Sequence, residues 1–354
     1  MVSDAGRGKS PVPLFREEIR IESTSPGAAG QAYAPTPLAL GARCAAWIVV
    51  AMLFAFIANA YLSFWRAWPG TGAALGSNAP LLAWMQLSLY LLAVVGPAAY
   101  VALTRERSLR RDEAVMARIA AYIAAAAFWS VLLVGLADAV ISFLRVEGLL
   151  EGVFGQKLAQ DLGRNHFRAP YVHGPLILAS LVLAAVSRSL GFIWLALLVV
   201  AAELLIVITR FVLSYEQAFM GDLVRMWYAG LFLFSSAYTL IEEGHVRVDV
   251  FYTNFSDRTK GLVNAVGSVL LGLPLCWTIL ILGMSDKTGI ISSPLLALEV
   301  TQSGYGMYIK YLMAAFLAIF AATMMIQFSA YFLESVADYR GDSGKRKAAP
   351  VTAA

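Results

Sequence analysis

The chain has 354 residues, of which 59% are hydrophobic and only 14% are charged, with a formal net charge of +4. A soluble domain is about one quarter charged, so this composition excludes an ordinary soluble protein and predicts an all-α integral membrane protein. Two distant cysteines exclude a disulfide framework, and the lack of a Gly-x-x-x-x-Gly-Lys-Ser/Thr loop argues against ATP hydrolysis by this chain.

Residues 1–37 are rich in Pro, Gly, Ser and charge, and they cannot bury enough apolar surface to fold alone. We predict that they form a disordered cytoplasmic tail. Residues 340–354 are predicted to form a second, basic cytoplasmic tail.

Apolar segments fill most of the remaining chain, and a helix needs about 20 apolar residues to cross a membrane. The predicted spans are Cys44–Trp65, Ala79–Leu103, Ile119–Leu144, Tyr171–Ser187, Ser189–Thr209, Asp222–Ile241, Leu262–Met284 and Tyr311–Leu333. The fourth is the shortest; its Pro175 lies near the start, where the missing N–H costs a helix nothing.

Basic residues gather in the connections after the second and sixth spans and at the C-terminus, which indicates that these sites face the cytoplasm. They are Arg105, Arg107, Arg110, Arg111, Arg118, Arg247, Arg258, Lys260, Arg340, Lys345, Arg346 and Lys347. The orientation is consistent only if the short fourth segment also crosses. We therefore expect about eight transmembrane helices, with both termini in the cytoplasm and no role in binding nucleic acid.

Two features are predicted at the outer membrane surface. The segment Arg145–Arg168 mixes leucines with charges and is expected to form a helix lying in the interface. Tyr305, Tyr308 and Tyr311 open the last span and are expected to belong to an aromatic belt.

The strip "EEGHVRVDVFY", Glu242–Tyr252, separates the sixth and seventh spans. It fits an ordinary cytoplasmic loop. It also alternates His245, Arg247 and Asp249 with valines, so that an extended chain would place the three polar groups on one face. Ser256-Asp257 then supplies a start signal for the next helix.

The strip and its surroundings resemble the small membrane subunit of tripartite ATP-independent periplasmic (TRAP) transporters. The matching stretches are "EGHVRVDVF", "FSDRTKGLVNAVGSVL", "GDLVRMWYAGLFLFSSAYTLIEEG" and "ITRFVLSYEQAF". The resemblance covers residues 189–339, the predicted four-helix core. Residues 38–188 are a predicted extension of about four more helices. One departure is "FMGDL", where Asp222 stands alone although family members often carry paired acids.

The resemblance implies a transporter component and not an enzyme, in the bacterial inner membrane. It implies a large membrane subunit that carries solute and sodium, and a periplasmic solute-binding protein; the small subunit would brace the large one. His245, Arg247 and Asp249 would have structural or partner-contacting roles. Organic acids are the commonest solute class that the resemblance implies. No catalytic, cofactor or metal-binding residue is expected in this chain, and sodium is expected in the partner.

Several ionisable residues fall at one predicted depth in the outer part of the membrane: Asp138, Glu203, Arg210, Asp222 and Arg225. Unpaired charges there are costly, so we expect Glu203 to be buried, and Glu203 or Asp138 to pair with Arg225. Alternatively, Arg210, Asp222 and Arg225 reach the headgroups, or the acids form a proton or sodium site.

Two further functions remain open. A respiratory anchor would need histidines inside helices to hold haem, but His166, His173 and His245 lie in predicted loops or helix ends. A self-sufficient secondary transporter would need interrupted helices at matching positions of two repeats, which the sequence does not display.

Overall fold

A computed structural model describes residues 35–187, 192–215, 217–241, 252–300 and 306–344. Within these ranges the regular structure is helical and no strand occurs, which agrees with the predicted all-α class. The strip from Glu242 to Phe251 lies outside the described residues, so the expectations for His245, Arg247 and Asp249 stay predictions.

Each predicted span coincides with a helix. The long helices are α1 (Pro37–Phe64), α2 (Leu81–Leu103), α3 (Leu109–Val146), α7 (Gly174–Val186), α8 (Phe192–Phe211), α9 (Ala218–Ile241), α10 (Asp257–Gly267), α11 (Leu273–Met284) and α13 (Lys310–Arg340). Short elements connect them: η1 (Thr71–Leu75), α4 (Leu150–Phe154), α5 (Gln156–Leu162), α6 (Asn165–Arg168), η2 (Ala169–His173), η3 (Tyr252–Asn254), η4 (Ser268–Gly272) and α12 (Ser292–Ala297).

Six helical segments of the described chain are long and apolar enough to cross a membrane, and the chain is a multi-pass membrane protein. They are Pro37–Phe64, Leu81–Leu103, Leu109–Val146, Asn165–Val186, Asp257–Met284 and Lys310–Arg340. The fourth joins α6, η2 and α7, so the shortest predicted span, Tyr171–Ser187, is part of a longer helical segment that could cross a membrane. Helices α8 and α9 are not among the six.

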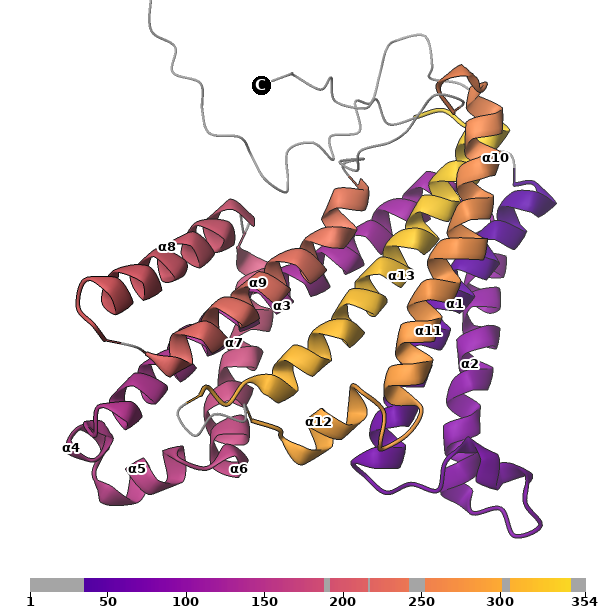
Figure 1. The fold of residues 1–354 in the computed structure, drawn as a ribbon. Coiled ribbons are helices and arrows are strands. Elements are labelled where there is room, and N and C mark those ends of the chain that lie inside the picture. The colour runs from indigo at the N-terminus through magenta and orange to yellow at the C-terminus, as the bar shows by residue number, and fades with distance from the viewer. Residues whose placement is uncertain (1–34, 188–191, 216, 242–251, 301–305, 345–354) are drawn as a thin grey trace, which may run out of the picture.

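The helices alternate in direction along the chain, except that α10 and α11 run in line as one segment, and the start of α1 and the end of α13 lie at the same end of the bundle (Figure 1). Helix α13 passes through the middle and packs against α1, α3, α9, α10 and α11. One apolar core joins α1, α3, α11 and α13, and another joins α3, α8, α9 and α13. The N-terminal extension and the C-terminal helices therefore share their cores.

Helix starts follow the capping signals in the sequence. Thr36 caps α1, whose first residue is Pro37, so this helix begins seven positions before the predicted Cys44. Ser256 caps α10 as predicted, because its Oγ accepts the N–H of Thr259 at 3.3 Å.

The predicted interfacial helix at Arg145–Arg168 is instead three short helices, α4, α5 and α6. Gly155 separates the first two with a φ of +76°, a conformation that favours glycine. Arg145 continues α3, and Arg168 is fully buried, so both ends of the predicted helix belong to the packed bundle.

Proline and glycine shape the seventh span. The turn η4, a π-helix, lies directly before Pro274, where the wider turn accommodates the missing N–H and the bulk of the ring. The helix continues through it. Nearer its start, a Cβ on Gly261 would lie 2.6 Å from the carbonyl oxygen of Ser335 and 2.7 Å from the amide nitrogen of Tyr339. Glycine is therefore needed for α10 to approach the backbone of α13.

Candidate functional site

The most concentrated group of buried ionisable side chains surrounds Asp138 on α3. Asp138, Arg168 and His173 are all fully buried. Arg168 Nη1 donates to Asp138 Oδ1 at 2.7 Å, and His173 Nε2 lies 3.1 Å from the same oxygen. Helices α3 and α6 and the π-helical turn η2 thus meet at one carboxylate.

His173 extends the group to α13. Its Nδ1 lies 2.7 Å from the hydroxyl oxygen of Tyr311, and the two rings stack. A neutral His173 with its proton on Nε2 satisfies both contacts, because it donates to Asp138 and accepts from Tyr311. This arrangement leaves one carboxylate charge opposite one guanidinium, Arg168, in a buried site.

Tyr308 closes the group from the segment before α13. Its backbone N–H donates to Asp138 Oδ2 at 2.7 Å, and its ring lies 4.1 Å from Arg168 Cζ. Arg145 donates to the Tyr308 hydroxyl at 2.6 Å, and that hydroxyl donates to the carbonyl of Gly163 at 2.9 Å. The prediction that Tyr308 and Tyr311 form an interfacial belt is wrong for these two residues, because both take part in the buried group.

Asp222 on α9 holds the neighbouring backbone. It is buried, and its Oδ2 accepts the N–H of Met307 at 3.0 Å. Consecutive amides, those of Met307 and Tyr308, therefore donate to Asp222 and Asp138. The two acids from α3 and α9 fix the chain as it enters α13, which is a structural role.

The expected pairing of Asp138 or Glu203 with Arg225 is wrong. Asp138 pairs with Arg168, while Arg225 contacts Asp222 at 3.3 Å, three residues earlier on the same helix, with its own side chain 73% exposed. Glu203 is exposed on α8 and not buried, and Arg210 is also exposed near the end of that helix.

A second buried ion pair lies at the opposite end of α3. Arg43 on α1 and Asp112 on α3 are both fully buried, with Nε and Oδ2 2.7 Å apart. Arg43 also donates to the carbonyl and hydroxyl oxygens of Thr104, which ends α2, at 2.7 and 2.9 Å. Trp47 Nε1 donates to Asp112 at 3.0 Å. This pair joins the first three helices.

These basic partners could not be identified directly from the amino-acid sequence. Arg43, Arg168 and His173 lie near the ends of helices, where a basic side chain normally reaches water or headgroups. The usable signal was Asp138, the lone acid of its predicted span, because a buried carboxylate requires a donor or cation from a neighbouring helix.

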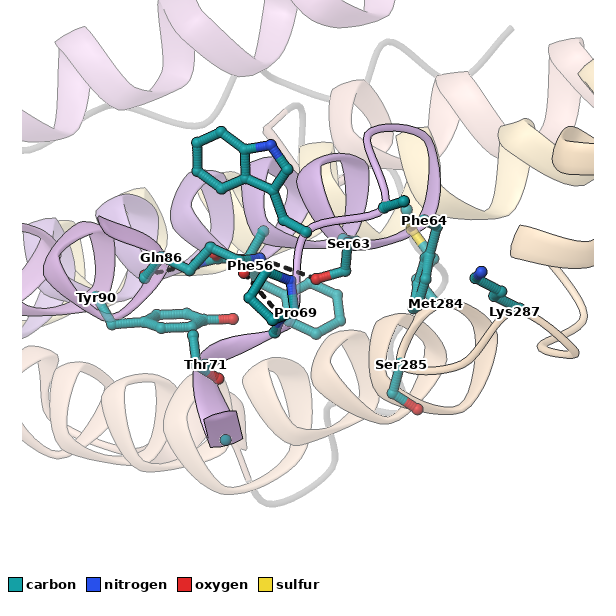
Figure 2. Close-up of a pocket in the computed structure, with 16 residues that line it drawn as sticks. Phe56, Ser63, Phe64, Pro69, Thr71, Gln86, Tyr90, Met284, Ser285 and Lys287 are labelled. Carbon is teal, nitrogen blue, oxygen red and sulfur yellow. Dashed lines mark hydrogen bonds between the residues drawn. The ribbon is translucent and has the colours of Figure 1, made fainter. Parts of the chain in front are cut away.

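A cavity of about 550 Å³ lies between the ends of α1 and α2 and the residues that follow α11. Figure 2 shows the fully buried Gln86 at its wall, next to Ser63. Gln86 Nε2 donates to Ser63 Oγ at 2.9 Å, and Gln86 Oε1 accepts the N–H of Gly70 at 2.8 Å. Lys287 lines the cavity on the α11 side (Figure 2). Gln86 thus holds the connection between α1 and α2 in place.

These groups are ion pairs and hydrogen bonds between helices. The buried charges oppose one another directly, and among the described residues no cluster of three His, Cys, Asp or Glu side chains could hold a metal ion. The polar groups tie helices together at the two ends of α3.

Comparison with known proteins places the C-terminal helices in a family. The profile described as "Tripartite ATP-independent periplasmic transporters, DctQ component" matches residues 199–338. Residues 199–338 are similar to this component. The family is a transporter component and not an enzyme family. No curated protein and no solved structure matches the chain.

The DctQ match begins within α8 and ends within α13, so it contains α9, α10, α11 and α12. It includes Glu203, Asp222 and the strip of His245, Arg247 and Asp249. The extension, which carries Asp138, Arg168 and His173, precedes it. The buried group around Asp138 therefore joins the DctQ helices to helices outside the match.

Proposed function

We propose that this chain is the small permease subunit of a TRAP transporter in the bacterial inner membrane. Its role is to scaffold a large membrane subunit that moves solute and sodium, with the solute delivered by a periplasmic binding protein. The DctQ match at residues 199–338 carries this proposal. The solute is proposed to be an organic acid.

The proposed topology has eight crossings with both termini in the cytoplasm. Six candidate spans and the antiparallel pair of α8 and α9 support it. The ends of α2 and α13 and the starts of α3 and α10 meet at one end of the bundle (Figure 1). Arg107 lies between α2 and α3, and Arg258 and Lys260 lie in the first turn of α10, which supports a cytoplasmic position for this end.

A structural role also suits the buried acids. Asp138 and Asp112 each face a guanidinium at 2.7 Å, and Asp222 accepts a backbone N–H. Breaking a pair of this kind leaves an uncompensated buried charge, so the paired helices keep their positions. His173 has both ring nitrogens in contacts with Asp138 and Tyr311, which leaves neither for haem iron.

Uptake by reconstituted vesicles tests the proposed function. Three preparations are compared under a sodium gradient. They contain the chain alone, the chain with the large subunit, and the chain with the large subunit and the periplasmic binding protein. We expect solute accumulation only in the third case. Accumulation by the chain alone would establish a self-sufficient transporter, and a Soret absorption band in the purified chain would establish a haem anchor.

A further inference from the structure

Helix α8 lies at the edge of the bundle, where it packs against α9 (Figure 1). Its inner face contains Leu195, Val199 and Ala202, which are all buried. The opposite face is apolar and open: the exposed fractions are 63% for Val200 and 57% for Leu204, and Leu197, Val207 and Phe211 are also exposed. This helix therefore presents an apolar stripe with no neighbour in the chain's described part.

Glu203 interrupts that stripe. It is exposed between Val200 and Leu204, and it makes no hydrogen bond or ion pair with the residues that the structure describes. At 1.5 Å per residue, it lies roughly 16 Å from the start of α8 and roughly 12 Å from its end. In the proposed topology, Glu203 therefore lies just on the outer side of the middle of the bilayer, within the hydrocarbon.

A carboxylate facing lipid at that depth costs about 2.5–3.5 kcal/mol on insertion scales. The other acids described above avoid this cost: Asp112 and Asp138 face guanidinium groups, and Asp222 faces a backbone N–H. Glu203 has an equal need for a donor. None of the residues that the structure describes supplies it, and a molecule that covers α8 could provide it.

We propose that the outer face of α8, centred on Glu203, is the surface on which a helix of the large membrane subunit docks. That helix would carry a lysine, an arginine or a neutral hydrogen-bond donor opposite Glu203. This inference rests on the proposed function, because it names the surface through which the scaffold holds its partner. Glu203 also lies within the DctQ match.

A second copy of this chain fits the surface less well. A two-fold dimer uses the same patch on both subunits, so packing α8 against α8 across a nearby axis would bring two Glu203 carboxylates together. Like charges at the centre of an interface are disfavoured. Lipid alone supplies no cation at this depth. The charge on Glu203 therefore selects a different protein chain with a complementary group.

Capture of the co-expressed large subunit by the tagged full chain in mild detergent tests the docking surface. Glu203→Leu removes the carboxylate from an apolar face, so we expect unchanged yield and thermal stability of the chain itself. We expect the captured large subunit to fall about tenfold or more, which corresponds to about 1.4 kcal/mol. Glu203→Gln keeps a hydrogen-bonding side chain and should lose less.

A matched pair of variants distinguishes obstruction of the outer face of α8 from a general effect of adding a bulky side chain to the membrane surface of the protein. Val200→Trp on α8 and Val182→Trp on α7 make the same change at valines that are 63% and 65% exposed. We expect Val200→Trp to reduce capture and Val182→Trp to leave it unchanged.

The results that would contradict the docking surface differ from those that would contradict the proposed function. Normal capture by both Glu203→Leu and Val200→Trp, beside normal capture by the unaltered chain, would overturn the docking surface and leave the proposed function intact. No capture by the unaltered chain would overturn the proposed function as well. A change in the oligomeric mass of the isolated chain in Glu203→Leu would overturn the assignment to the large subunit in favour of a second copy.

Discussion

Asp138 illustrates how single residues stabilise this bundle. Its carboxylate accepts from Arg168 at 2.7 Å and from the Tyr308 amide at 2.7 Å, and it also contacts His173. Each of these partners comes from a different element. A buried charge with this many donors is stable as a group, but the loss of one member leaves an uncompensated charge.

Replacing Arg168 by Met should therefore lower the free energy of unfolding by about 3–5 kcal/mol, because Asp138 would remain buried without its cation. The double variant Arg168→Met with Asp138→Asn should be less destabilised than the sum of the two single variants. Thermal or denaturant unfolding in detergent of the four proteins measures this coupling. Additive effects would show that the contact does not contribute to stability.

For single residues, the sequence predicts which buried acids need a partner but not which residue becomes that partner. Asp138 is identifiable as a lone acid in an apolar span. Its partner Arg168 follows 30 positions later, at the end of a segment that resembles a surface helix. Only the positions of α6 and η2 against α3 bring the guanidinium to the carboxylate, and such positions depend on tertiary packing.

Among the elements, the contact of α10 with α13 depends on close backbone approach. Gly261 allows it, because an added Cβ would meet backbone atoms of Ser335 and Tyr339, which cannot rotate away. Gly267, six residues later on the same helix, has nothing within 4 Å of the corresponding position. The effect of adding a Cβ can therefore be compared at the two positions on one helix.

Gly261→Ala should destabilise the protein by about 1–3 kcal/mol through overpacking, whereas Gly267→Ala should stabilise it by up to about 1 kcal/mol through higher helix propensity. Melting temperatures of the two variants in one detergent provide the measurement. Equal shifts of the same sign would mean that α10 and α13 are not in backbone contact.

Helix positions were well predicted because about 20 consecutive apolar residues are a strong signal. The interruptions at Gly155 and Gly163 and the π turn η2 were not predicted, because they depend on a few local residues. The contacts of the half-buried Tyr308 and the buried Tyr311 with the group around Asp138 were not predicted either. Aromatic residues at the end of a span look the same in sequence whether they face headgroups or a neighbouring helix.

The molecule as a whole is organised around α13, which contacts helices from both parts of the sequence. The DctQ helices are joined to the extension by two apolar cores and by the contacts of Asp138 with Tyr308 and of Arg110 with Asp338. The even number of added helices in the proposed topology keeps the orientation of the DctQ helices. We therefore regard the extension as part of one scaffold.

Co-purification of the large subunit with the tagged full chain tests this account most directly. Membranes that contain both chains are solubilised in mild detergent, and the complex is isolated through the tag on this chain. We predict that the large subunit elutes with it in a fixed ratio and remains bound through size-exclusion chromatography. Elution of this chain free of the large subunit, with each protein folded, would contradict the account.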